Sequence, residues 1–363
     1  MRHCLHTAMS SPLRAVVLDV APELALDAAC NPDSSTMYGK DIEEVLHKIG
    51  YTNVEVVPLK SHARKAIAEI RRRQKRTDVF INLYDLSDET GQKIVDYMEK
   101  NGIPFTGAGS RFYDPPREML KRVCRGCGVG TTPYILCIDP DDVSESMVSE
   151  LGGFPLFVKP EHGYDSVGID VGSRVTDLQS LQQRVEKVVT DHGGALIEPY
   201  IEGREFSVLV LGGKTSADEP IVFTPVEYVF PETRTVAPFI TFDDKWGPTF
   251  ECRWRLLDQN EHELAHELQE MGKNLFLGFE ADGYARADIR QDKRTGKLYV
   301  LDLNPNCSLF YSAEGTADTI LRLCGWTKEQ FLRAMIEQAK ARAQLYADVN
   351  AVEVVYIEGN AVI

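Results

Sequence analysis

Two carboxylates, an amide and an arginine stand at alternate positions between residues 283 and 306. The alternation of small apolar and polar residues on both sides of a charged loop predicts two antiparallel strands joined as a hairpin. If the hairpin turns in the middle of that loop, Asp288 lies opposite Asp302. Arg286 then lies opposite Asn304, and all four side chains share one face. Carboxylate and amide oxygens suit Mg²⁺, although a salt-bridged surface hairpin is the alternative.

A second candidate is Lys159, which ends an apolar run, Phe154–Pro160, that reads as a buried strand. A cation there costs free energy unless an anion meets it. The loop that follows contains Gly163 and Gly168 and could fold over phosphate groups. This predicts a lysine in a phosphate site, with a surface lysine as the alternative.

Two acids, Glu198 and Glu205, bracket the junction between the second and third predicted units. Small ligands often bind at such junctions. Carboxylates there could accept hydrogen bonds from an adenine amino group and from ribose hydroxyls. Solvated or ion-paired acids explain the pattern equally well.

Three short motifs carry no function in our interpretation. His262–His266 matches the zinc-protease pattern H-E-x-x-H, but glutamates surround it and no third ligand stands at a recognisable spacing. Gly212–Thr215 resembles the end of a phosphate-binding loop, yet Val208 occupies the required first glycine, which indicates a turn. The lone C-x-x-C at 124–127 is predicted to pack on a helix.

Composition narrows the class of protein. The 363 residues are 43% hydrophobic and 26% charged, and the net charge of −15 argues against a general nucleic-acid or membrane-surface binder. No apolar run approaches the ~20 residues of a membrane span. Eight cysteines without a framework pattern suit a reducing compartment, so we expect a cytoplasmic protein. A weak organelle presequence is the alternative.

Strands and helices alternate in the first part of the chain, which predicts an α/β unit with a mainly parallel sheet. The predicted strands are 13–20, 54–59, 78–83 and 104–107, and the predicted helices are 37–49, 63–73, 90–101 and 115–127.

Two α+β units follow. The second has predicted strands at 134–138, 154–160, 167–171 and 195–201 and helices at 143–151 and 176–191. The third holds the hairpin, a helix over 328–347 and a strand over 352–363. We place the unit boundaries at 1–128, 129–200 and 201–363.

Together these residues resemble the ATP-grasp superfamily, and within it the D-alanine–D-alanine ligase family. The similarity is strongest over Phe154–Ile169, Ala195–Leu211 and Gly283–Asn306. The resemblance implies an N-terminal parallel α/β domain followed by two α+β subdomains that clasp ATP. It also implies ATP as cofactor with two Mg²⁺ ions, or Mn²⁺ in their place.

The resemblance assigns roles residue by residue. Nucleotide contacts are implied for Arg117, Lys159, Ser166, Glu198, Pro199, Tyr200, Ile201, Glu205 and Lys245, with Lys245 reaching the γ-phosphate. Asp288, Asp302 and Asn304 resemble the metal ligands. Arg286 is similar to the arginine that stabilises a tetrahedral intermediate, and Ser308 stands where a glycine backbone helps form the oxyanion site.

Several departures concern the substrate side. Asp302 replaces the family's usual glutamate, and Ser308 replaces its glycine. The early substrate loop is missing, and the loops 84–89 and 164–165 are rewritten. Acids in these two loops (Asp85, Asp88, Glu89 and Asp165) suggest a positively charged substrate group, with a solvated lid as the equal alternative.

We therefore expect an ATP-dependent carboxylate–amine ligase that acts through an acyl phosphate on a substrate other than D-alanine. Its partners would be a small carboxylate and an amine, and the resemblance implies that both are amino acids. We expect neither nucleic acid nor a membrane as a partner. Analogy with the family suggests a homodimer. A small-molecule kinase and a catalytically impaired ATP-binding protein are the alternatives.

Overall fold

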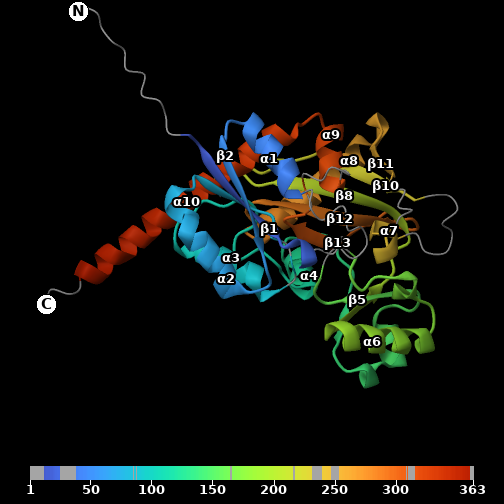
Figure 1. Cartoon of the computed structure of the whole chain (residues 1–363). Coiled ribbons are helices and arrows are strands. Elements are labelled where there is room, and N and C mark those ends of the chain that lie inside the picture. Colours follow the sequence, from blue (N-terminus) through green and yellow to red (C-terminus); the bar gives the residue numbers. More distant parts are fainter. Residues whose placement is uncertain are drawn as a thin grey trace, which may run out of the picture.

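The computed structural model describes residues 12–24, 38–84, 86, 88–163, 166–215, 217–230, 239–246, 253–307, 309 and 315–359. Within them the protein is a mixed α/β fold with one parallel and two antiparallel sheets (Figure 1). No helix in this part of the chain combines the length and the apolar character that crossing a membrane requires.

The first sheet is parallel, as predicted, with the strand order β2-β1-β3. Its strands are β1 (Arg14–Val20), β2 (Asn53–Leu59) and β3 (Val79–Asn82), and its helices are α1 (Tyr38–Lys48), α2 (Ala63–Arg73) and α3 (Glu89–Lys100). Alternate residues of β1 and β3 face α1 on one side and α2 with α3 on the other. The strand predicted at 104–107 is reduced to one bridge between Phe80 and Phe105.

The second sheet is antiparallel, with the order β4-β7-β5-β6. It comprises β4 (Ile135–Cys137), β5 (Leu156–Pro160), β6 (Arg174–Val175) and β7 (Ala195–Pro199), and it packs with α5 (Glu145–Glu150) and α6 (Leu178–His192). The strand predicted at 167–171 is wrong. Asp170 instead accepts a hydrogen bond from the Gly172 N–H and begins a short 3₁₀ turn, a local pairing that competes with strand formation.

The third sheet has six strands in the order β11-β10-β8-β12-β13, with β9 paired to β8. They are β8 (Gly203–Leu211), β9 (Ile221–Val222), β10 (Val226–Val229), β11 (Arg253–Leu256), β12 (Tyr284–Asp292) and β13 (Leu298–Pro305). One face packs on α4 (Arg117–Gly126) and α8 (His262–Gly278). The other face packs on α9 (Thr316–Leu323) and α10 (Lys328–Gly359).

The hairpin β12–β13 has the predicted register. Asp288 pairs with Asp302, and Arg286 pairs with Asn304. An irregularity follows Asp288, where the register shifts before Ile289. The shift leaves the four polar residues on their common face.

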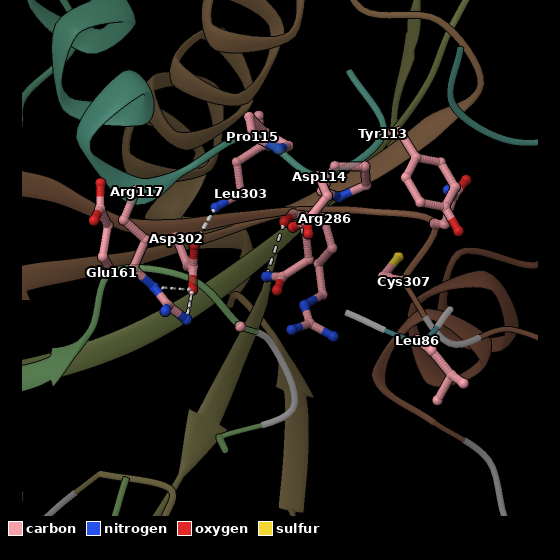
Figure 2. A pocket seen from close by; sticks show the side chains of 14 residues that line it. Leu86, Tyr113, Asp114, Pro115, Arg117, Glu161, Arg286, Asp302, Leu303 and Cys307 are labelled. Carbon is pink, nitrogen blue, oxygen red and sulfur yellow. Dashed lines mark hydrogen bonds and ion pairs between the residues drawn. The ribbon is translucent and has the colours of Figure 1, made fainter. Parts of the chain in front are cut away.

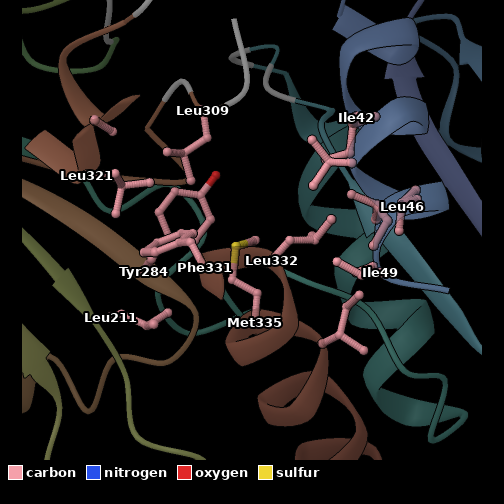
Figure 3. Packing of buried hydrophobic residues seen from close by; sticks show 14 of the residues in the cluster. Ile42, Leu46, Ile49, Leu211, Tyr284, Leu309, Leu321, Phe331, Leu332 and Met335 are labelled. Atoms are coloured by element: carbon pink, nitrogen blue, oxygen red, sulfur yellow. The ribbon is translucent and has the colours of Figure 1, made fainter. Parts of the chain in front are cut away.

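Helix α10 joins the first sheet to the third. Its apolar side packs Phe331, Leu332 and Met335 between α1 and the third sheet (Figure 3). Arg342 donates to the Phe105 carbonyl at 2.6 Å and pairs with Asp282 at 2.6 Å, which links the segment after α3 to the residues before β12.

The strand predicted at 352–363 is wrong over 352–359, because the helical backbone of α10 runs through Gly359 (Figure 1). Residues 360–363 lie outside the described residues. The run of valines, Tyr356 and Ile357 favours a strand by propensity. The chain has no glycine or proline between 328 and 358, so each added residue can extend the helix by one hydrogen bond.

Candidate nucleotide and metal site

Asp288 is the centre of a polar network on the partly buried polar face of the hairpin. Arg286 binds its carboxylate with two hydrogen bonds of 2.9 and 2.8 Å. Ser207 of β8 donates to it at 2.7 Å, and the Asn304 amide donates at 2.9 Å. Strands β8, β12 and β13 therefore hold one carboxylate in a fixed position.

Asp302 is held by Arg117, the first residue of α4. The guanidinium contacts one Asp302 oxygen at 3.1 and 2.8 Å and donates to the Pro160 carbonyl at 2.8 Å. Arg117 is 5% exposed, so this ion pair lies largely out of water. The contact links the end of β5 to β13.

Glu198 carries a buried ion-pair cluster. Its carboxylate pairs with Lys159 at 2.8 Å on one oxygen and with Lys121 of α4 on the other, and Thr132 also donates to it at 2.6 Å. Burial alone would raise the pKa of Glu198, but Lys121 and Lys159 outweigh it and lower the pKa to about 2. Burial lowers the pKa of Lys159, against the opposing effect of Glu198. Two buried cations thus share one anion, which leaves the cluster net positive.

Glu205 and the segment after Glu198 meet at Arg290. The guanidinium binds Glu205 at 3.0 and 2.8 Å and donates to the Ile201 carbonyl at 2.8 Å. It also lies 5.2 Å from the centre of the Tyr200 ring. Burial raises the pKa of Glu205, although Arg290 opposes the shift. The predicted hinge and the predicted ribose acid are therefore neighbours.

The glycine-bearing loop after β5 reaches α7 (Phe242–Trp246). Ser166 donates to the Ile240 carbonyl at 3.3 Å, and the Phe242 N–H donates to the Ile169 carbonyl at 2.9 Å. Lys245 lies in α7, but its side chain is outside the described residues, as are Tyr164, Asp165 and Ser308.

A pocket opens beside the hairpin (Figure 2). Arg286 and the segment 302–307 line one part of it, and residues of the first unit and of the loop after β5 line the rest. The full lining is Leu86, Tyr113, Asp114, Pro115, Arg117, Glu161, Gly163, Arg286, Asp302, Leu303, Asn304, Pro305, Asn306 and Cys307. The rewritten loop 84–89 contributes Leu86 to this lining, and Gly163 directly precedes the rewritten pair 164–165. Asn306 and Cys307 directly precede Ser308, the other departure from the family.

Two acids that suggested a cationic substrate have structural roles. Asp88 caps α3 by accepting hydrogen bonds from the backbone of Thr90 and Gly91. Glu89 pairs with Lys93 at 2.7 Å on the surface of α3. The remaining two, Asp85 and Asp165, lie outside the described residues.

The donor set of the hairpin fits Mg²⁺. In the described part of the chain no three His, Cys, Asp or Glu side chains gather as a metal-binding group. The hairpin offers two carboxylates and one amide on a common face, joined across the paired strands. Mg²⁺ is commonly held by one or two carboxylates, with substrate phosphates and water completing its shell. The three predicted ligands are thus sufficient when a nucleotide shares the site.

The three short motifs without an assigned function lie on a helix surface, in a connection between strands, and at the end of a helix. His262 and His266 lie on the exposed side of α8, whose buried side is formed by Leu268, Met271 and Leu275. Gly212 and Gly213 lie in the connection between β8 and β9. Cys124 is buried in α4, and both cysteines of the C-x-x-C motif are free thiols.

Sequence reasoning missed Lys121, Arg290 and Ser207 as parts of the site. Arg290 follows Arg286 and Asp288 in the same alternation, so the period of the strand could have identified it. Lys121 stands four residues after Arg117 on the same helix face. Ser207 gave no signal of its own, because its role depends on the pairing of β8 with β12.

The structure resembles solved ligases along almost its whole length. The D-alanine–D-alanine ligase from Coxiella burnetii matches with a TM-score of 0.69 and 16% identity, covering 95% of this chain and 100% of that one. The Bacillus anthracis enzyme complexed with ATP matches with a TM-score of 0.63 and 17% identity, covering 92% and 99%. The chain therefore has the ATP-grasp fold of these proteins.

Sequence relatives cover less of the chain. An uncharacterized protein, y4sG, of Sinorhizobium fredii is 30% identical over 211 residues, which span 57% of this chain and 58% of that protein. The D-alanine–D-alanine ligase of Acinetobacter baylyi is 28% identical over 230 residues, spanning 62% and 68%. The family model described as D-ala D-ala ligase C-terminus matches residues 123–337, more than half of the chain. By this match, the chain belongs to the D-alanine–D-alanine ligase C-terminal family.

Proposed function

We propose that the protein is an ATP-dependent carboxylate–amine ligase that forms an amide bond. The observation that carries this proposal is the common face of Arg286, Asp288, Asp302 and Asn304, which borders a pocket beside a buried lysine pair. A cationic group and metal-binding oxygens at one pocket suit the transfer of a phosphoryl group to a carboxylate.

The nucleotide would lie between the second and third sheets. Lys159 and Lys121 would supply positive charge for the phosphates, since both lysines pair with the single carboxylate of Glu198. The segment 198–201 would border the adenine, and Glu205 would accept from the ribose. Mg²⁺ held by Asp288, Asp302 and Asn304 would neutralise the phosphate oxygens when bound.

In the proposed reaction a substrate carboxylate attacks the γ-phosphorus of ATP, which gives an acyl phosphate and ADP. An amine then attacks the acyl carbon, loses a proton, and expels inorganic phosphate as the amide forms. Arg286 would stabilise the oxyanion of the tetrahedral intermediate, together with a backbone N–H near Ser308. Lys245 would contact the transferred phosphoryl group. The chain contributes positioning and charge rather than a covalent nucleophile.

We further propose a cytoplasmic homodimer built from three units, 1–128, 129–200 and 201–363. Helix α4 belongs to the first of these units by sequence, yet it packs on α8 of the third. It would therefore couple the first unit to the catalytic hairpin.

The first test incubates the protein with MgATP and a panel of amino acids. Release of ADP and the mass of the product are the two measurements. We expect a new amide, and we expect D-alanine alone to support far less turnover than the ~1–10³ per second of ordinary enzymes. The loops that border the pocket differ from the resemblance family, and a site built for one polar group rejects substrates that lack it. ADP release with a hydroxyl compound and no amine would instead identify a kinase. Rapid D-alanyl-D-alanine synthesis would show that the changed loops are neutral.

The second test concerns ATP affinity. Lys159→Ala removes a phosphate cation, and Glu205→Ala removes the proposed ribose acceptor. Each contact of this kind contributes about 1.5–3 kcal/mol, so affinity should fall roughly ten- to a hundredfold. Calorimetric titration with ATP measures the change, and Lys293→Ala on an exposed ion pair is the matched control. Unaltered affinity in both site variants would contradict the nucleotide assignment.

A further inference from the structure

Asp114 occupies a fixed place in the wall of the pocket (Figure 2). It is preceded by the buried Tyr113, whose hydroxyl donates to the Tyr84 carbonyl. It is followed by Pro115 and Pro116, which restrict the backbone before α4 begins. The anchored neighbours on both sides give the Asp114 carboxylate a defined position beside the hairpin.

The carboxylate of Asp114 differs from those of the two hairpin aspartates. Asp288 is bound by Arg286, and Asp302 is bound by Arg117. Among the described residues, no side chain or backbone group makes a hydrogen bond or an ion pair with the Asp114 carboxylate. Partial burial raises its pKa, an effect that His162 and Arg117 oppose and Asp302 reinforces. The pocket wall thus carries an acid that lacks a cation of its own.

Asp114 is exposed to solvent. A group that binds a substrate arriving from solution must be accessible in this way. The same pocket contains Arg286, the cation proposed to face the acyl carbon. An attacking amine must come within about 3–3.5 Å of that carbon in a productive geometry. A positively charged amine entering this pocket meets two carboxylates besides Asp302, those of Asp114 and Glu161. Asp114 stands on the segment before α4, between anchored neighbours, and its carboxylate is the one we assign to the amine.

We propose that Asp114 binds the ammonium group of the amine substrate and directs it toward the acyl group, where the nitrogen gives up one proton to water before it attacks the acyl carbon. This rests on the proposed ligase function. The ligand class is a primary amine that is cationic at neutral pH. Its remainder would be small and largely apolar, because Leu86, Tyr113 and Cys307 line the same pocket.

Hydroxylamine separates binding of the amine from the earlier formation of the acyl phosphate. It is uncharged at neutral pH and traps an acyl phosphate as a hydroxamate without needing an ammonium site. The experiment compares wild-type protein, Asp114→Asn and Asp114→Glu with MgATP, a panel of amino-acid carboxylates, and either hydroxylamine or a cationic amino acid as the amine. Asp191→Asn on the exposed end of α6 is the matched control. Thermal unfolding of each variant shows whether the fold is kept.

We expect Asp114→Asn to keep hydroxamate formation within about threefold of wild type. Its kcat/KM for the cationic amine should fall about ten- to a hundredfold, mainly through KM, since a charge-assisted contact of ~1.5–3 kcal/mol is lost. Asp114→Glu should recover part of that loss, and Asp191→Asn should behave as wild type.

Three outcomes would overturn the proposal. Asp114→Asn could leave the KM for the cationic amine unchanged, or it could reduce both reactions equally in a folded protein. Wild type could also form hydroxamate yet accept no cationic amine at any concentration. Failure of the ligase proposal has a different signature, because wild type would then form neither hydroxamate nor ADP with any carboxylate.

Discussion

Replacement of Asp302 by asparagine should reduce turnover by about 10²–10³-fold or more while the chain stays folded. The change removes one of the two carboxylate charges on the hairpin face but keeps the size of the side chain. Metal affinity should fall with it, because Mg²⁺ prefers charged oxygen ligands. Arg117 would also lose its anion, and a buried cation without a partner is unfavourable.

ADP release and calorimetric binding of Mn²⁺ in the presence of nucleotide measure the two effects. Asp302→Glu retains the carboxylate and should retain turnover. Glu280→Gln breaks an exposed ion pair with Arg111 and is the matched control for loss of one negative charge. Full activity of Asp302→Asn would mean that the hairpin acids serve only to hold Arg117 and Arg286.

Replacement of Glu198 by glutamine should give the largest loss of stability. Lys121 and Lys159 would remain buried with no anion, and breaking a buried ion pair from one side costs about 3–5 kcal/mol. Lys121 still donates to the Thr132 hydroxyl and Lys159 still donates to the Leu301 carbonyl, so the protein should fold at neutral pH.

The same residue predicts a pH dependence of the free energy of unfolding. The pKa of Glu198 is lowered from 4.5 to about 2 in the folded protein. The stabilisation is therefore fully present above pH 4.5 and is lost as the pH falls toward 2, with a size of about 3 kcal/mol. Denaturant unfolding between pH 3 and 7 measures it. Glu198→Gln should flatten this part of the curve, and an equally steep curve in the variant would place the acid sensitivity elsewhere.

The sequence predicted the hairpin well because two constraints agreed there. The period of two assigns each side chain to a face, and the loop between the strands fixes their register. Asp288 and Asp302 are accordingly paired as expected. The irregularity after Asp288 could not be predicted, since it depends on the strands that flank the hairpin.

The buried cluster was less accessible to prediction. Lys159 and Glu198 are neighbours because β5 pairs with β7, with Phe157 opposite Glu198 and Lys159 opposite Leu196. Nothing local to either residue specifies that register. Glu198 was interpreted as an adenine acceptor, and its two lysine partners became visible only in the folded chain. The wrong strand at 352–359 has the opposite cause. Local β-propensity predicted a strand there, whereas the helix that precedes these residues continues through them.

The second sheet has an apolar core of its own, formed by residues between 135 and 197. Its links to the rest of the molecule include Arg117 on the Pro160 carbonyl, Lys159 on the Leu301 carbonyl and Lys121 on Glu198. Movement of this sheet away from the hairpin would therefore uncover polar groups in preference to the apolar core. Exposure of apolar surface raises the heat capacity and exposure of polar surface lowers it. Separation of this sheet from the hairpin should accordingly change the heat capacity little and in the negative direction, in contrast to unfolding of either part.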